Sequence, residues 1–346
     1  MPIPPSRDAE PASPPRITVV VPVHDGGLAF ERCLASLAAV AAPAFDLVVV
    51  DDGSTDGSAE RAAARGARIV RLPRRLGPAA ARNAGAAVAT SELLCFLDAD
   101  CELHADALAR LTARFDGDPG LAAIFGSYDD APAAPGVVSR FKNLFHHWTH
   151  QRAPERARTF WGACGAIRRE RFLALGGFDA RRYPEPSVED IELGYRLVES
   201  GGEIRLDRAV QVKHLKRWTL GGLVRTDVFR RGVPWTELLL ERQGRGGELN
   251  VGRRERIVVA VGVLGTAALP AALWWPPLLV VPLVAALVLV GSYRGFYALV
   301  RRRAGDATAI AALPLHALYC CCCCAALAIG IARHAISPRR KTFADV

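Results

Sequence analysis

The sequence predicts an α/β protein in which a mostly parallel sheet, with helices on both faces, precedes a C-terminal transmembrane helical region. Two observations predict this fold class. Within residues 16–218, short runs of β-branched and other apolar residues alternate with segments that repeat apolar residues at helical spacing, which is typical of parallel sheets. Within residues 257–332, basic residues separate long apolar stretches, which is typical of helices that cross a membrane.

The individual elements follow from composition. Short runs rich in Val, Ile and Leu predict buried strands at 17–23, 45–50, 68–72 and 93–97. Helical spacing between them predicts helices at 28–37, 58–65 and 78–90, and the alternation continues to Tyr128. Further along we expect a strand at 160–167, a helix at 187–200 that ends at Gly201-Gly202, and one or two strands within 203–214.

Three apolar stretches, roughly 257–275, 277–299 and 308–332, predict two to three transmembrane helices, because about twenty apolar residues span a bilayer. The alternative is a single buried hydrophobic helical domain. Arginine clusters at 253–256 and 301–303 flank the first two stretches. By the positive-inside rule they predict a multi-pass protein of the cytoplasmic (inner) membrane whose α/β domain faces the cytoplasm.

The predicted order of domains follows from these features. The first fifteen residues are rich in Pro and contain no apolar run, so neither a signal peptide nor an ordered element is expected there. The segment before the first apolar stretch mixes apolar residues with Arg, which favours helices at a membrane surface. The expected domains are a disordered lead at 1–15, an α/β domain at 16–218, interfacial amphipathic helices at 219–256, transmembrane helices at 257–332 and a basic tail at 333–346.

The placement of charges and cysteines argues against a nucleic-acid-binding protein and against a protein stabilised by disulfides or by a cysteine-bound metal. The net charge is +9, but from Ile257 onward eight Lys/Arg stand against two Asp/Glu, so the α/β part is nearly balanced. No basic stripe with interleaved aromatic residues is present, and a nucleic-acid partner is not expected. Four of the nine cysteines are scattered through apolar segments and five form the run 320–324, without disulfide or metal-ligand spacing. They are interpreted as small buried apolar residues.

Two acidic clusters follow predicted strands. Ligands of such sheets bind beyond the carboxyl ends of the strands. Asp51 and Asp52, with Gly53-Ser54, are either a turn or acceptors of hydrogen bonds from a nucleoside. Asp98 and Asp100 are two residues apart, so on a strand they would face one site and hold a divalent cation; the alternative is a turn followed by a helix cap.

Three further groups are candidates for chemistry. Arg82, beside Asn83 in a predicted helix, either contacts solvent or binds a diphosphate. The pair Glu189-Asp190 follows Ser187 with the spacing of a capping box, and alternatively Asp190 is a general base for an acceptor hydroxyl. In His214-Leu215-Lys216-Arg217-Trp218 the His is a candidate metal ligand, the Arg a phosphate clamp and the Trp a platform for a sugar ring.

As a set, the motifs resemble those of the family 2 inverting glycosyltransferases of the GT-A fold, a Rossmann-like architecture, in their membrane-anchored bacterial form. The similarity covers roughly Ile17 to Trp218. The matching segments are Val21-Pro22-Val23-His24-Asp25, Asp51-Asp52-Gly53-Ser54-Thr55-Asp56, Ala81-Arg82-Asn83-Ala84-Gly85, Phe96-Leu97-Asp98-Ala99-Asp100, Gly176-Gly177-Phe178-Asp179 and Glu189-Asp190-Ile191-Glu192-Leu193.

The resemblance implies a role for each site residue. Asp190, with Glu189 beside it, is implied as the catalytic base. Residues implied in nucleotide-sugar binding are Pro22, Val23, Asp52, Arg82, Asp98 and Arg217. Asp100, with Asp98 and His214, is implied to hold Mn²⁺ or Mg²⁺. Trp218 and Gly162 are implied in acceptor binding. His214 stands where processive polysaccharide synthases have Gln, and His24-Asp25 replaces Tyr-Asn, so processivity and the contacts to the base are expected to differ.

The expected function is metal-dependent, inverting transfer of a sugar to a membrane-associated acceptor, such as a lipid, a polyprenyl phosphate or a lipid-linked glycan. The alternative is a catalytically inactive membrane scaffold that binds a nucleotide-sugar. A small transporter is disfavoured, because Arg294 and His316 are the only ionisable residues in the apolar stretches apart from the flanking clusters. A dehydrogenase is excluded, because the first strand leads into His24-Asp25-Gly26-Gly27 and not into a Gly-x-Gly-x-x-Gly turn.

Overall fold

The structure, a computed structural model, describes residues 15–242 and 252–336. The expected disordered lead and most of the basic tail lie outside these residues. The chain divides into an N-terminal unit, Met1–Asp129 with His150–Lys216, and a C-terminal unit, Asp130–Thr149 with Arg217–Val346. The division differs from the predicted α/β domain of 16–218, because residues 130–149 group with the C-terminal unit.

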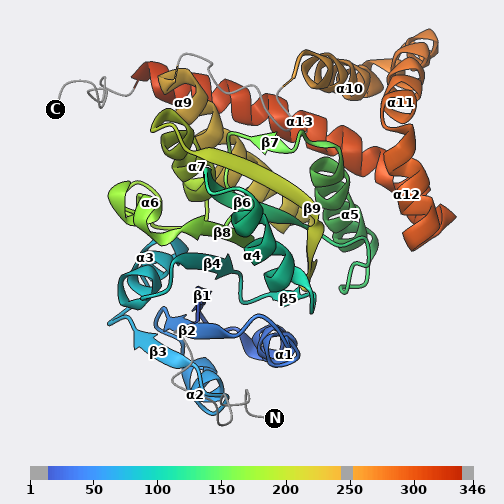
Figure 1. Ribbon diagram of the computed structural model, residues 1–346. Coiled ribbons are helices and arrows are strands. Elements are labelled where there is room, and N and C mark those ends of the chain that lie inside the picture. The colour runs from blue at the N-terminus through green and yellow to red at the C-terminus, as the bar shows by residue number, and fades with distance from the viewer. Residues whose placement is uncertain (1–14, 243–251, 337–346) are drawn as a thin grey trace, which may run out of the picture. The chain divides into compact units, whose positions relative to one another are not determined.

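The N-terminal unit is built on one mixed, mostly parallel sheet (Figure 1). Its strand order is β3-β2-β1-β4-β8-β6-β9-β5, and β7 pairs with β9. Strands β3, β2, β1 and β4 are parallel to one another, as are β6 and β9, whereas β8 is antiparallel to both β4 and β6. The strands are β1 Ile17–Val23, β2 Phe45–Asp51, β3 Arg68–Arg71, β4 Leu93–Leu97, β5 Cys101–Leu103, β6 Leu121–Tyr128, β7 Arg156–Ala157, β8 Cys164–Arg168 and β9 Glu203–His214.

Helices pack against this sheet, as α3 does against β1 and β2 and α4 against β6 and β9. Apolar strands such as β4, which is buried along its whole length, are central because helices and neighbouring strands cover them. The helices of this unit are α1 Gly27–Ala38, α2 Ser58–Ala63, α3 Pro78–Val88, α4 Ala107–Gly117, α6 Arg169–Ala174 and α7 Glu189–Glu199. The predicted α/β class is confirmed, while β8 begins four residues later and α7 two residues later than expected.

Buried cysteines form part of this core. Cys33, Cys95, Cys101 and Cys164 are buried free thiols, which agrees with their interpretation as small apolar residues. Burial raises the pKa of Cys95 to about 12, so this thiol stays protonated and unreactive near neutral pH.

The C-terminal unit is helical, and its helices α10 to α13 are orange to red in Figure 1. Helix α5, Val137–Arg152, was not predicted and contributes most of its length to this unit. The remaining elements are α8 Leu220–Arg225, the π-helix η1 Thr226–Gly232, α9 Val233–Glu241, α10 Arg253–Ala272, the 3₁₀ turn η2 Pro276–Leu279, α11 Val280–Ser292, α12 Arg294–Ala304 and α13 Asp306–Ile336. Its core is a cluster in which Phe141 and Phe145 of α5 contact Phe296 of α12.

Two helices, Arg254–Ala272 and Asp306–Ile336, are long and apolar enough to cross a membrane. A third candidate is Pro276–Ser292 together with Arg294–Ala304, which bends by 79° at its break. The predicted stretch 277–299 is therefore not one straight helix. In α12, Phe296, Leu299 and Val300 are buried in the core cluster, while the basic residues 301–303 are exposed.

Candidate active site

The predicted site residues gather at one edge of the sheet in the N-terminal unit. Because β8 is antiparallel to both of its neighbours, β6 runs in the same direction as β4, and the carboxyl ends of β1, β2, β4 and β6 share an edge. Asp52 follows β2 and Asp98 follows β4. The start of α7, with Glu189 and Asp190, meets the same edge through the contacts described below.

Arg82 of α3 is the centre of the site. Only 5% of its surface is exposed, and its guanidinium donates to Asp98 Oδ1 at 2.6 Å and to Glu189 Oε1 at 3.0 Å. Burial alone would lower the pKa of Arg82, but the adjacent carboxylates of Asp98 and Glu189 raise it above its usual value. Burial raises the pKa of Asp98, against the opposing effect of Arg82. The buried guanidinium of Arg82 thus brings together two other predicted site residues, Asp98 and Glu189.

The turn at 176–179 supports Arg82 from its apolar side. The guanidinium lies 5.5 Å from the centre of the Phe178 ring. The neighbouring Asn83 donates to the Phe178 carbonyl at 2.8 Å and accepts from the Phe178 N–H at 2.9 Å. Gly177 has φ of +72°, and a Cβ there would lie 2.5 Å from the Asn83 side chain, so glycine is required by both conformation and space. Asn83 therefore holds the turn, a role that its sequence context did not indicate.

Asp190 is held at the edge of this cluster by backbone donors. The N–H of Gly162 donates to Asp190 Oδ2 at 3.0 Å, and the N–H of Ile191 donates to Oδ1 at 2.8 Å. The capping box considered as the alternative is wrong, because the residue at the N-cap is Val188, with no side-chain cap hydrogen bond. Instead, the Ser187 N–H donates to Glu189 Oε2 at 2.9 Å. The Asp190 carboxylate is thus fixed by the loop before β8 and remains partly exposed.

Gly162→Ala is expected to lower kcat/KM about tenfold, equivalent to roughly 1.4 kcal/mol of transition-state stabilisation. A Cβ at this position would lie 3.2 Å from Arg82 Cζ, so the guanidinium must shift away from its carboxylates. Steady-state kinetics with whichever nucleotide-sugar the wild-type protein turns over measure the change. Gly117→Ala, at an open position at the end of α4, is the control. Equal kinetics for the two variants would contradict the close packing of Gly162 on Arg82.

Asp98 and Asp100 do not lie on a strand. Strand β4 ends at Leu97, and Ala99 and Asp100 form a turn, so the expectation that the two carboxylates face one site as strand neighbours is wrong. Asp98 contacts Arg82, whereas Asp100 Oδ2 lies 3.5 Å from His214 Nε2 at the end of β9. Burial favours the neutral acid, but the nearby His214 and Lys216 lower the pKa of Asp100.

The site fits an open divalent-cation centre with few protein ligands. Across residues 15–242 and 252–336, no group of three or more metal-binding side chains is present. His214 Nε2 and Asp100 Oδ2 lie 3.5 Å apart, so an imidazole nitrogen and a carboxylate oxygen are close together at this edge of the sheet. Mn²⁺ and Mg²⁺ retain water and substrate phosphate oxygens as further ligands, so two protein ligands agree with a metal bound together with a diphosphate.

The loops after β1 and β2 hold each other in place. The Thr55 N–H donates to Asp25 Oδ1 at 2.7 Å, and the Asp25 N–H donates to the Ser54 hydroxyl at 3.1 Å. Asp25 has φ of 47°, a left-handed conformation that is rare outside glycine and that these bonds stabilise. Burial works against ionisation of Asp56, but hydrogen bonds from Ser58, the Gly27 N–H and Arg61 lower its pKa to about 2. The two loops form a preorganised rim.

The remaining predicted residues take different positions. The carboxylate of Asp52 accepts the N–H groups of Leu76 and Gly77 at 2.6 and 2.8 Å, so it orders the loop before α3. Val23 is buried, and its carbonyl accepts the Asp52 N–H at 2.8 Å, while Pro22 is partly exposed beside it. Arg217 and Trp218, which begin the second segment of the C-terminal unit, differ in exposure. Arg217 is exposed, whereas Trp218 is buried and donates from Nε1 to Asn143 Oδ1 at 3.3 Å.

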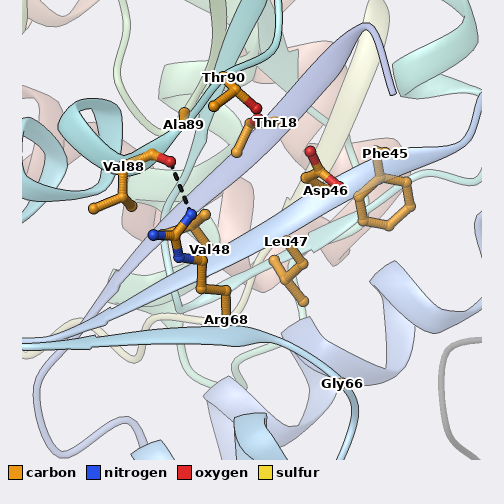
Figure 2. Close-up of a pocket in the computed structure, with 10 residues that line it drawn as sticks. All are labelled: Thr18, Phe45, Asp46, Leu47, Val48, Gly66, Arg68, Val88, Ala89 and Thr90. Atoms are coloured by element: carbon orange, nitrogen blue, oxygen red, sulfur yellow. Dashed lines mark hydrogen bonds between the residues drawn. The ribbon is translucent and has the colours of Figure 1, made fainter. Parts of the chain in front are cut away.

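A cavity of about 270 Å³ lies at the opposite edge of the sheet (Figure 2). It is lined by the first residues of β2 and β3, including Phe45 and Arg68, and by residues 88–90 at the end of α3. Figure 2 shows the Arg68 guanidinium turned toward the Val88 carbonyl, to which it donates at 3.0 Å. None of the predicted site residues lines this cavity, so it is separate from the cluster around Arg82.

A mixed α/β sheet with ordered loops at its carboxyl edge and carboxylates around a buried arginine defines a glycosyltransferase of the GT-A class. The model of the family "Glycosyl transferase family 2" matches residues 18–175. The uncharacterized glycosyltransferase Rv0539 of Mycobacterium tuberculosis is 32% identical over 193 residues, which cover 53% of this chain and 82% of that protein. The chain belongs to glycosyltransferase family 2.

Two further similarities extend this assignment. The pre-mycofactocin glycosyltransferase of Mycobacterium tuberculosis is 28% identical over 225 residues, which cover 62% of this chain and 46% of that protein, so the chain spans about half of that relative. The mannosyltransferase PcManGT from Pyrobaculum calidifontis, solved in complex with GDP-Man and Mn²⁺, has the same fold, with a TM-score of 0.53 and 19% identity. That alignment covers 94% of this chain and 88% of the other.

Proposed function

We propose that the chain transfers a sugar from a nucleotide-sugar to a membrane-associated acceptor, with inversion at the anomeric carbon and with Asp190 as the general base. The observation that carries the proposal is the arrangement around Arg82, which brings Asp98 and Glu189 together beside the partly exposed carboxylate of Asp190. Donor binding and proton removal thereby fall within one cluster.

The residues of the chain divide the reaction between them. The loops after β1 and β2, tied together by Asp25 and Thr55, bind the nucleoside. Asp190 accepts the proton of the acceptor hydroxyl as the acceptor oxygen forms its bond to the anomeric carbon. At the same time the bond from that carbon to the diphosphate breaks, and the nucleoside diphosphate leaves with the electron pair. A single displacement from the opposite face inverts the anomeric centre.

Negative charge on the departing diphosphate must be neutralised. Asp100 and His214 would hold the cation, Mn²⁺ or Mg²⁺, which when bound supplies Lewis-acid stabilisation of that charge. Arg217, which is exposed, stays a predicted ligand of the phosphates through charge-assisted hydrogen bonds. Gly162 would lie beside the acceptor, because its backbone N–H holds Asp190, the proposed base for the acceptor hydroxyl.

The apolar helices support a membrane-associated acceptor, such as a lipid, a polyprenyl phosphate or a lipid-linked glycan. Two helices have the length and composition of membrane spans, and the segment 273–275 between α10 and η2 exposes Leu273, Trp274 and Trp275. Tryptophan is enriched where a membrane meets water. We place the protein in the cytoplasmic membrane with the N-terminal unit in the cytoplasm, because the basic residues at 254–256 and 301–303 follow the positive-inside rule.

Incubation of purified membranes with UDP-, GDP- and dTDP-sugars tests the proposal. Each donor is supplied with and without Mn²⁺, and both nucleotide release and label in the lipid fraction are measured. Release with one class of donor, accompanied by labelled lipid, is the expected result. Binding of a donor without turnover on any acceptor would contradict transfer and would favour the catalytically inactive scaffold.

Asp100→Ala is expected to lower the metal-dependent rate at least a hundredfold, because the variant loses the carboxylate that lies 3.5 Å from His214 Nε2. Activity titrated with MnCl₂ and MgCl₂ measures the effect. Asp106→Ala, which removes an exposed carboxylate paired with Arg110, is the matched control and should leave the titration unchanged. Full wild-type activity in the presence of a chelator would refute the metal role.

A further inference from the structure

A stack of buried aromatic rings runs through the site beside the residues already assigned. The Tyr128 ring lies parallel to the His214 imidazole, with centroids 4.3 Å apart and an interplanar angle of 11°. The Trp161 ring packs edge-on against the same Tyr128 ring, with centroids 4.7 Å apart and an interplanar angle of 86°. All three residues are at least nine-tenths buried. The rings come from the ends of β6 and β9 and from the loop before β8, so distant parts of the chain supply them.

Each end of the stack touches a different part of the site. At one end, His214 Nε2 faces Asp100 Oδ2 at 3.5 Å. At the other end, Trp161 directly precedes Gly162, whose N–H donates to Asp190 Oδ2 at 3.0 Å. His150 packs edge-on against Trp161 at 4.8 Å and closes the array. One line of rings therefore connects the proposed cation ligand with the loop that holds the proposed base.

Ring contacts of this kind fix orientation. A side chain packed face to face against a neighbouring ring cannot turn about its own axis without losing that contact. For His214, such a turn would carry Nε2 away from Asp100. Groups that orient a metal-binding histidine typically change metal affinity by about 10- to 100-fold when they are removed. Trp161 in turn holds the Tyr128 ring. The residue after Trp161 is Gly162, whose N–H donates to Asp190.

We infer that Tyr128 and Trp161 are positioning residues, and that their stack sets the orientation of His214 toward a divalent cation and the position of the Gly162 loop against Asp190. The inference rests on the proposed metal-dependent transfer. Tyr128 acts on the cation side alone. Trp161 acts on both sides, because it contacts Tyr128 through its ring and continues into Gly162 through its backbone.

Mn²⁺ binding in the presence of GDP or UDP, followed by electron paramagnetic resonance, tests the cation side without any turnover. Tyr128→Leu should weaken Mn²⁺ binding about tenfold and raise the Mn²⁺ concentration for half-maximal rate, while kcat at saturating Mn²⁺ stays within about threefold of wild type. Tyr128→Phe retains the ring and should stay within about twofold of wild type. His214→Ala gives the reference for complete loss of the ligand.

Trp161→Leu should lower kcat at least tenfold even at saturating Mn²⁺ and should change the pH profile of kcat, because the support of Asp190 is altered. Phe115→Leu is the matched control, since Phe115 is a buried aromatic that contacts Arg168, at the opposite edge of the same sheet. It should lower the thermal midpoint without changing Mn²⁺ affinity.

The two levels of the proposal fail in distinguishable ways. Wild-type affinity for Mn²⁺ in Tyr128→Leu, or an equal loss in Phe115→Leu, would overturn the positioning role while the metal role stands. A wild-type protein that binds no Mn²⁺ with either nucleotide would overturn the metal role itself, and the inference with it. A kcat of Trp161→Leu that matches Tyr128→Leu would overturn the link to Asp190.

Discussion

Asp190→Asn is expected to abolish sugar transfer while donor binding stays unchanged. The amide has nearly the same shape as the carboxylate but cannot accept the proton of an acceptor hydroxyl. Loss of a general base typically costs about 10² to 10⁴ in rate. Transfer of labelled sugar to the membrane fraction measures the rate, and calorimetric titration with the donor measures binding.

Glu199→Gln, near the end of the same helix, is the control and should retain both properties. Transfer by Asp190→Asn at the wild-type rate would rule out Asp190 as the base. The size of the effect also reports on the acceptor. A phosphate acceptor is already ionised, so a weak dependence on Asp190 would favour a polyprenyl phosphate over a hydroxyl.

Arg82→Met is expected to destabilise the N-terminal unit by about 3–5 kcal/mol and to abolish activity, because it leaves Asp98 and Glu189 without their buried counter-ion. Arg82→Lys should recover little activity, since one ammonium cannot match a planar group that donates to two carboxylates. Thermal unfolding of the purified protein, followed by limited proteolysis of the N-terminal unit, measures the loss.

Two comparisons make this result specific. Arg32→Met removes an exposed ion pair with Glu102 and should cost less than about 1 kcal/mol. The triple variant Arg82→Met, Asp98→Asn, Glu189→Gln should regain part of the lost stability, because no uncompensated carboxylate remains. A stability for Arg82→Met equal to that of Arg32→Met would contradict the central place of Arg82.

Composition was sufficient to predict two strands that are buried along all or nearly all of their length. β4 begins and ends at the predicted residues, and β1 does likewise, because a short apolar run between polar residues has one favourable placement in a covered sheet. β5, β7 and α5 were missed for physical reasons. β5 and β7 are only three and two residues long, and α5 carries several His and Arg residues among its apolar positions. β5 and β7 form because they pair with β9, and α5 forms because it packs against α12 in the C-terminal unit. In the case of β5 and of α5, the partner element lies far away in the sequence.

The site residues were predicted by type, whereas their partnerships were not. Spacing placed Asp98 and Asp100 together on a strand, but the end of β4 at Leu97 turns one toward Arg82 and the other toward His214. Nothing in the local sequence of Tyr128 or Trp161 indicates a stack, because the contact depends on the register of β6 with β9. A tyrosine at the carboxyl end of a central strand was the one available signal.

The adjacency of Arg82 and Asn83 has a consequence for engineering. Arg82 contacts Glu189, 107 residues further along, and Asn83 holds Phe178, 95 residues further along. A single turn of α3 therefore sets the position of two distant segments. Removing one residue from α3 would rotate the remainder by about 100° and detach both segments at once. A chimera that takes residues 158–190 from a relative should therefore take α3 from the same relative. Otherwise the contacts of Arg82 and Asn83 with this segment would have no matching partners.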